Sequence, residues 1–198
     1  MPDTQSHDHR DDTAHVFWGE IAPCDHLVQI YENDGALLDA LELFAASGMM
    51  GGEAVVVIAT PTHREELRGR ILRLGIDLNA AENDDRYIAL TAKEALSEFM
   101  VDGWPDDVLF RNFVMRVVTR ARAGGRRVRA FGEMVALLWS QGYNGATVRL
   151  EYLWEHMCRE ESFSLFCAYP KAGFTRDAAE SVREIRAAHN RVVANTGY

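Results

Sequence analysis

Lysine is nearly absent from this chain: Lys93 and Lys171 stand against 19 arginines, and neither lysine belongs to a Gly-Lys-Ser/Thr triplet. A phosphate-binding loop needs glycine N–H groups around the phosphate oxygens, a lysine for the β- and γ-phosphates, and a Ser or Thr for Mg²⁺. After the first expected strand the chain instead reads Glu32-Asn33-Asp34-Gly35, and two carboxylates there repel a triphosphate. The sequence therefore excludes a standard phosphate loop.

Cysteine, basic charge and long apolar runs are also scarce. The three cysteines, Cys24, Cys158 and Cys167, are too few and too scattered for a disulfide framework. The formal net charge of −9 disfavours nonspecific binding to nucleic acid or an anionic membrane. The chain start lacks the regions of a signal peptide, and the clearest apolar run, Ala54–Ala59, is too short to cross a bilayer. We expect a soluble, cytoplasmic protein without nucleic-acid or membrane partners.

The length of 198 residues and the hydrophobic fraction of 47% suit one compact domain. Residues 1–20 are polar, acidic and aperiodic, so we expect a flexible tail there and a single domain over residues 21–194. His7, Asp8, His9 and His15 lie in that tail, and metal sites need ligands fixed in space. We therefore predict no metal site and no cofactor.

Short apolar strands alternate with helical patterns along the whole chain. Strands are expected near residues 27–31, 54–59, 87–90, 128–131 and 162–169, and helices near 36–47, 61–74, 92–99, 107–123, 133–138, 146–157 and 175–192. The run Ala54–Ala59 is apolar on both faces, which is typical of a central parallel strand. The alternation predicts an α/β fold, with right-handed crossovers, a mostly parallel sheet and helices on both of its faces.

Details of these helices are expected as follows. Leu67, Ile71 and Leu74 point inward from the second helix, and Thr91 caps the helix that follows it. The final helix carries Ile185, His189 and Val192 on one apolar stripe. On that stripe His189 is read as a core histidine, and His26 as a residue that orients the first strand. Asp102 and Asp106 are expected to cap a turn and the next helix. The basic run from Arg120 to Arg129 favours a helix C-terminus with its flanking cations, and an anion- or partner-binding surface stays open as the alternative.

Six sequence blocks occur in an order that resembles a known family. They are His26–Tyr31, Phe44–Glu53, Val57–His63, Phe99–Asp106, Arg129–Val135 and Phe163–Pro170. Together they cover about residues 20–192 and resemble the MEDS family, the methanogen/methylotroph, DcmR-type sensory domain. The resemblance implies a RecA/KaiC-like, P-loop-like three-layer sandwich with a degenerate phosphate loop. It also implies bacterial signal transduction in which small molecules, including hydrocarbon derivatives, are sensed.

A candidate site follows from the sheet alone, because ligands of open parallel sheets sit beyond the carboxyl ends of the strands. The residues expected at that edge are Tyr31, Glu32, Thr60, His63, Glu133 and Tyr169. Aromatic walls with a few polar groups suit a small organic ligand. Structural roles stay open for each: the two tyrosines can anchor loops, His63 can be an exposed first-turn residue, and Glu133 can simply interact with a helix N-terminus.

The function predicted from these observations is a non-catalytic sensor or regulatory module. Ligand binding is expected to shift loops 31–36, 60–64 and 132–135, and a partner such as a histidine kinase or transcription regulator reads the change. Two alternatives stay open. One is a hydrolase that acts on a small molecule or nucleotide with Glu133 or His63 as base, and the other is an adaptor, a homo-oligomer without ligand.

Overall fold

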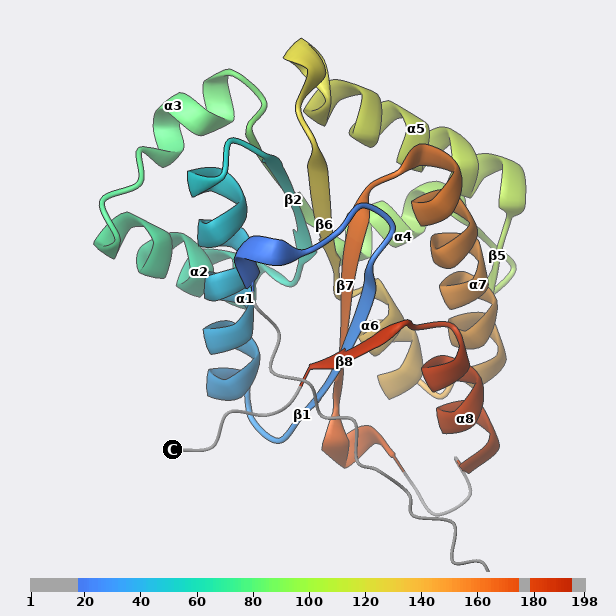
Figure 1. Ribbon diagram of the computed structural model, residues 1–198. Coiled ribbons are helices and arrows are strands. Elements are labelled where there is room, and N and C mark those ends of the chain that lie inside the picture. The colour runs from blue at the N-terminus through green and yellow to red at the C-terminus, as the bar shows by residue number, and fades with distance from the viewer. Residues whose placement is uncertain (1–17, 175–178, 194–198) are drawn as a thin grey trace, which may run out of the picture.

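The computed structural model describes residues 18–174 and 179–193, and it centres on one six-stranded sheet (Figure 1). The strand order is β3-β2-β6-β7-β1-β8, and all strand pairs in this sheet are parallel. The strands are β1 (His26–Tyr31), β2 (Ala54–Ala59), β3 (Tyr87–Thr91), β6 (Val128–Gly132), β7 (Ser164–Pro170) and β8 (Arg191–Val193). The predicted α/β fold with a parallel sheet is confirmed.

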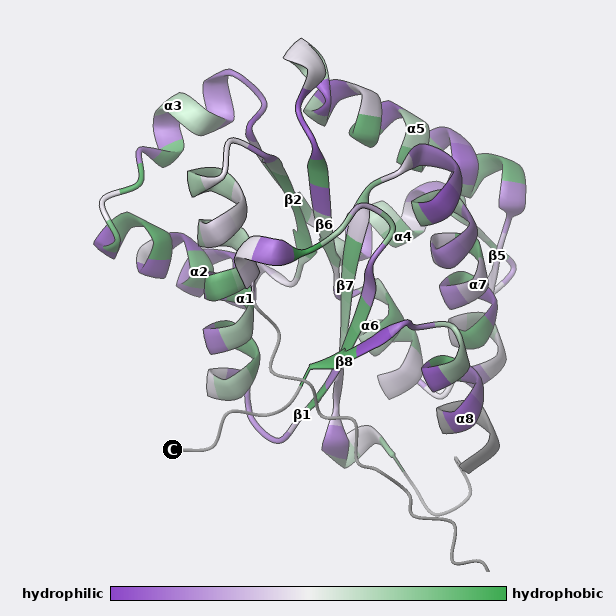
Figure 2. Cartoon of the chain, in the orientation of Figure 1, coloured by the Kyte–Doolittle hydropathy of each residue, from purple (hydrophilic) through white to green (hydrophobic). Residues whose placement is uncertain are grey.

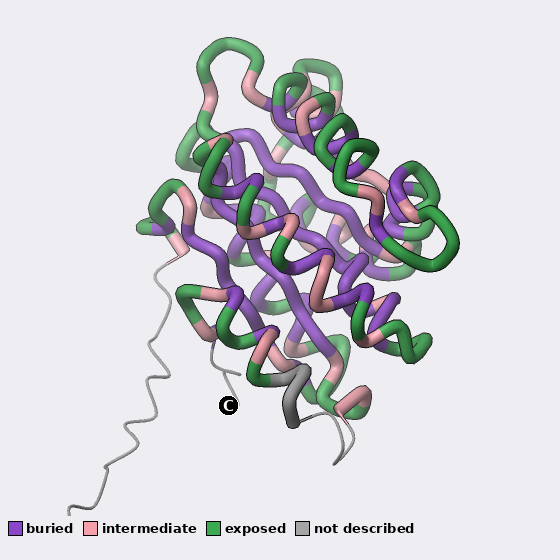
Figure 3. The backbone as a smooth tube through the Cα atoms, turned by 90° about the vertical axis from the view of Figure 1, so that its right-hand side faces the viewer, coloured by how far each residue is buried: buried purple, intermediate pink, exposed green. Residues whose placement is uncertain are grey.

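Helices cover both faces of the sheet (Figures 1 and 3). One face packs against α1 (Asp34–Met50), α2 (Pro61–Arg73) and α3 (Leu78–Asn83). The opposite face packs against α4 (Ala92–Phe99), α5 (Asp107–Ala121), α6 (Met134–Ser140), α7 (Asn144–Glu161) and α8 (Ala179–Ala187). We call these the α1 face and the α7 face.

Two hydrophobic cores, one on each face, follow from the period of two in every strand. In β2, Val55 and Val57 belong to the core of the α1 face, and Val56 and Ile58 belong to the core of the α7 face. All of β2 is buried, which is why the strand reads as an unbroken apolar run (Figure 2). Burial of each such side chain stabilises the fold by roughly 1.5–3 kcal/mol.

Helix starts follow the capping residues closely. Asn33 accepts a hydrogen bond from the Ala36 N–H at 3.0 Å, and Asp106 accepts from two N–H groups at the start of α5. Thr60 accepts from the His63 N–H at 3.4 Å. The expected cap at Thr91 is wrong, because its hydroxyl instead accepts from Arg64 Nη1 at 2.9 Å.

The structure corrects two further expectations. Leu74 is 52% exposed, because α2 ends at Arg73 and Gly75 turns the chain away with a φ of 77°. The final helix ends at Ala187, and Val192 lies in β8 beside Val28. The expected turn at Asp102 is present, and it joins β4 (Met100–Val101) and β5 (Trp104–Pro105) into a short antiparallel hairpin.

The N-terminal segment is described only from Trp18, so residues 1–17, with the three tail histidines, lie outside the described residues. Trp18–Glu20 forms the short 3-10 helix η1, and the Trp18 ring packs on Phe44 and Phe166 with centroids 6.0 and 5.7 Å away. Two further 3-10 turns are η2 (Ala123–Gly125) and η3 (Lys171–Gly173). Within the described part of the chain, every helix is too short or too polar to cross a membrane.

Candidate functional site

The predicted edge contains a topological switch point between β2 and β6. The chain leaves β2 into α2 on the α1 face, and it leaves the neighbouring β6 into α6 on the α7 face. In doubly wound sheets, ligands generally bind where two neighbouring loops depart in opposite directions. Thr60 follows β2 directly, and Glu133 follows β6 directly.

Glu133 lies at this switch point and is only 4% exposed. Its Oε2 atom accepts a hydrogen bond from the Thr60 N–H at 2.7 Å, and its Oε1 atom lies 2.8 Å from Nδ1 of His63. The Glu133 N–H donates to the Ile58 carbonyl at 2.9 Å, which fixes the backbone next to β2. Both carboxylate oxygens are therefore held, as the burial of a charged group requires.

His63 connects the buried carboxylate with the surface. Its Nε2 atom lies 3.6 Å from Oδ1 of Asp34, whose side chain is 70% exposed. The hydrogen bond with Glu133 raises the pKa of His63 above its ordinary value, although burial opposes the shift, and Asp34 adds to the rise. The imidazole thus tends toward its protonated form between two carboxylates.

Tyr31 stands at the end of β1, buried and next to the same charges. Burial raises the pKa of its hydroxyl well above the ordinary value, and the negative charges of Glu133 and Asp34 raise it further. The phenol therefore stays neutral and can donate a hydrogen bond. Tyr31, Asp34, Thr60, His63 and Glu133 form what we call the edge group.

Glu32 lies on the rim of this edge and pairs with another loop. Its carboxylate accepts a hydrogen bond from Lys171 Nζ at 2.5 Å, and both side chains are largely exposed. The hydrogen bond with Lys171 lowers the pKa of Glu32 below its ordinary value. The pair joins the loop after β1 to η3, which follows β7.

Tyr169 is separated from the edge group by the sheet itself. Cys167 and Tyr169 belong to the core of the α7 face, whereas Tyr31 belongs to the core of the α1 face. The Tyr169 hydroxyl donates a hydrogen bond to Glu151 of α7, and its ring packs against Trp139 and Phe174. Of the six predicted residues, Tyr31, Thr60, His63 and Glu133 come together, Glu32 lies on the rim, and Tyr169 faces the other side.

Asp34 and a second polar cluster were not among the predicted site residues. Asp34 could have been included, because it is the first residue of the helix that follows β1 and so lies at the same edge of the sheet. The second cluster is His26, Glu151, Cys167 and His189, all with buried side chains on the α7 face. Burial lowers the pKa of His189 to about 4, and burial with the nearby Glu151 raises the pKa of the Cys167 thiol. The His189 imidazole and the Cys167 thiol are thus both uncharged near neutral pH.

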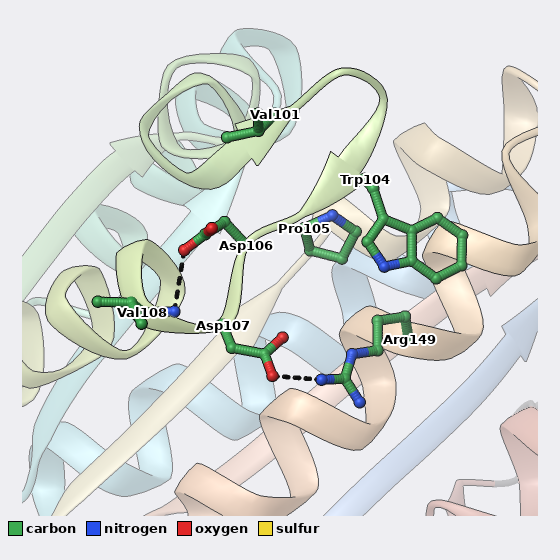
Figure 4. A pocket seen from close by; sticks show the side chains of 7 residues that line it. All are labelled: Val101, Trp104, Pro105, Asp106, Asp107, Val108 and Arg149. Carbon is green, nitrogen blue, oxygen red and sulfur yellow. Dashed lines mark hydrogen bonds and ion pairs between the residues drawn. The ribbon is translucent and has the colours of Figure 1, made fainter.

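A surface hollow, shown in Figure 4, has no lining residue in common with either polar group. It has a volume of about 580 Å³ and is formed by the β4–β5 hairpin, the first turn of α5 and Arg149 of α7. Arg149 pairs with Asp107 across its floor, and Trp104 is 51% exposed beside it. None of the six predicted site residues lines this hollow.

The fold is that of a doubly wound α/β domain with a polar side-chain group at its switch point. The chain matches the family described as MEDS, MEthanogen/methylotroph, DcmR Sensory domain, over residues 25–190. It belongs to this family, which confirms the resemblance and identifies the chain as a sensory module. In the comparison with curated proteins, nothing matches this chain.

Proposed function

We propose that this sensory module is non-catalytic, binds a small organic molecule at the edge group, and passes its signal to a partner protein. The carrying observation is the position of Glu133, 2.7 Å from the Thr60 N–H and 2.8 Å from His63 Nδ1. With His63 Nε2 at 3.6 Å from Asp34, one polar chain joins loops 31–36, 60–64 and 132–135. A ligand that engages any member of this chain biases the positions of the other loops.

The charges of the edge group favour a neutral or cationic ligand. Asp34 and Glu133 both act on Tyr31 and His63 as negative charges, and the chain as a whole is acidic. A ligand with a hydrogen-bond donor can replace His63 at the exposed Asp34 carboxylate, which frees His63 to move relative to Glu133. The partner, a histidine kinase or a transcription regulator, reads that movement.

The same contact favours one alternative, a hydrolase acting on a small molecule or nucleotide. An imidazole held by a carboxylate at 2.8 Å is the arrangement of an oriented general base. Turnover that disappears in Glu133→Gln supports the hydrolase. Ligand-dependent stabilisation without turnover supports the sensor. Self-association with no ligand effect supports the oligomeric adaptor.

The test is a thermal-shift screen of the full chain against neutral and cationic small organics, one-carbon and halogenated compounds, and Mg-ATP. A compound that binds only the folded state raises the melting temperature by mass action. Asp34→Asn changes an exposed residue of the edge group, and Asp39→Asn is a matched control on α1, paired with Arg70 at 2.6 Å.

We expect an organic compound to stabilise the unmodified chain and Asp39→Asn equally, and to lose most of its shift in Asp34→Asn. A shift that both Asp34→Asn and Glu133→Gln retain places the ligand elsewhere and overturns the site. Stabilisation by Mg-ATP overturns the claim that nucleotide binding was lost with the phosphate loop.

A further inference from the structure

Four potential metal ligands meet in the interior of the α7 face. They come from three elements and one connecting segment: His26 begins β1, Glu151 lies in α7, Cys167 lies in β7, and His189 lies between α8 and β8. One ligand atom from each residue lies within 4.8 Å of all the others. The side chains of His26, Glu151 and His189 are 3%, 1% and 0% exposed, and Cys167 is fully buried.

Three distances between these atoms match the edges of a tetrahedral coordination shell. Glu151 Oε2 lies 3.5 Å from Nε2 of His26 and 3.5 Å from Nε2 of His189. Cys167 Sγ also lies 3.5 Å from His26 Nε2. Zinc bonds of about 2.0–2.3 Å to nitrogen, oxygen and sulfur place tetrahedral ligands about 3.3–3.6 Å apart. These three pairs are therefore already spaced for one ion, and all four donors lie within 4.8 Å of one another.

Two of the atoms that face this centre have no hydrogen-bond partner among the described residues. Glu151 Oε2 and His189 Nε2 are buried and unpaired among the residues that the structure describes. Buried polar atoms without partners cost free energy, and a bound ion satisfies them. The Nδ1 atom of His26 is also unpaired there, and the ion does not supply its partner.

Outer contacts orient two of the ligands toward the centre. His189 Nδ1 lies 2.5 Å from the Ile185 carbonyl, so it donates that proton and leaves the Nε2 lone pair facing Glu151. The Tyr169 hydroxyl donates to Glu151 Oε1 and leaves Oε2 for the centre. Hydrogen bonds of this kind, to the far side of each ligand, are the usual support of metal sites in proteins.

We propose that His26, Glu151, Cys167 and His189 form a structural site for a divalent transition metal of the zinc class. Two imidazoles, a thiolate and a carboxylate suit Zn²⁺, and four protein ligands leave no open position for a substrate. On binding, the Cys167 thiol releases its proton to solvent. The dipositive ion then balances one thiolate and one carboxylate, so the buried site is neutral overall. The ion ties the segment between α8 and β8 to the centre of the sheet.

The first experiment is elemental analysis of the full chain, purified without a histidine tag and reconstituted with Zn²⁺. Replacement of His7, His9 and His15 together by alanine provides a background that lacks the N-terminal histidines. We expect a single equivalent of zinc in this background and a lower melting temperature after treatment with a chelator. A chain that takes up no stoichiometric zinc or cobalt, and melts unchanged with chelator, overturns the site.

Cobalt substitution tests the ligands themselves. We expect visible d–d bands of tetrahedral cobalt together with a thiolate charge-transfer band. Cys167→Ser is expected to lose the charge-transfer band, and Cys158→Ser is the matched control, because Cys158 is equally buried but does not belong to the cluster. Retention of the thiolate band in Cys167→Ser, with its loss in Cys158→Ser, contradicts the assignment. Circular dichroism of each variant separates loss of metal from loss of fold.

Discussion

The Nδ1 atom of His63 lies 2.8 Å from the Oε1 atom of Glu133, although the two residues follow different strands and are 70 positions apart in the chain. The contact exists because β2 and β6 are neighbours whose following helices depart on opposite faces. Two loops that separate after the sheet are thereby joined through one side-chain pair. This pair gives the first two predictions.

Glu133→Gln is expected to lower the free energy of unfolding by about 1–3 kcal/mol. The carboxylate accepts from the Thr60 N–H with one oxygen and from His63 with the other. A glutamine amide has one acceptor oxygen, so its NH₂ group faces one of the two donors. Urea denaturation measures the loss. Glu94→Gln, at an exposed position of α4, is the control and is expected to change stability by less than about 0.5 kcal/mol.

The stability that His63 contributes is expected to decrease as the pH rises. Its pKa is raised in the folded state, chiefly by the hydrogen bond with Glu133, above the unfolded value of about 6.5. A raised pKa gives a contribution that is fully present below the unfolded pKa and is lost as the pH rises through the folded pKa. The difference in unfolding free energy between the unmodified chain and His63→Gln should therefore shrink from about pH 5.5 to about pH 8.5. A difference that grows over this interval contradicts the prediction.

Arg129→Met is expected to destabilise the fold by about 3–5 kcal/mol. Arg129 is 2% exposed, pairs with Glu53, donates to the Phe44 carbonyl at 2.9 Å, and lies over the Phe44 ring. Its removal leaves the Glu53 carboxylate buried without its main partner. Guanidinium chloride denaturation provides the measurement. Arg120→Met, at a side chain that is 55% exposed, is the matched control and should cost far less.

Two glycine-to-alanine changes in helices are expected to have opposite signs. A Cβ atom at Gly48 meets Cδ of Arg129 at 2.6 Å, so Gly48→Ala displaces a buried, paired side chain and destabilises by about 1–3 kcal/mol. At Gly69 the nearest atom is a terminal nitrogen of Arg73 at 3.6 Å. Gly69→Ala therefore stabilises by about 0.4–1 kcal/mol, through lower entropy of the unfolded chain. Melting temperatures that fall in both variants contradict this account.

The main elements could be predicted from the sequence because their signals are local. The strand predicted at Ala54–Ala59 has the same first and last residues as β2. A short apolar run bounded by glycines on one side and a proline on the other is typical of a buried strand. The strand β8 could not be predicted in the same way. Its three residues carry no period, and only pairing with β1 makes them a strand.

The candidate site could be predicted in part for a similar reason. Thr60, His63 and Glu133 could be predicted because they lie just after the carboxyl ends of β2 and β6, which are neighbouring strands. Tyr169 was misplaced relative to them because the face of a residue depends on strand parity, which the carboxyl-edge rule does not include. Arg129 was expected in the strand at 128–131, which β6 confirms, and it was also counted in a basic run at a helix C-terminus. Its burial on the α1 face, against Glu53 and the Phe44 carbonyl, was not predicted.

The order of the strands also affects when this protein can fold. Within the described sheet β1 lies between β7 and β8, so both of its neighbours are made after the other strands of this sheet. During synthesis β1 has no partner in the sheet until β7 has left the ribosome. Pairing over such long sequence separations closes large loops, which slows folding relative to proteins with local contacts. The nascent chain therefore leaves β1 without a partner in the sheet until β7 emerges, and an unpaired strand of this kind is the type of surface that chaperones protect.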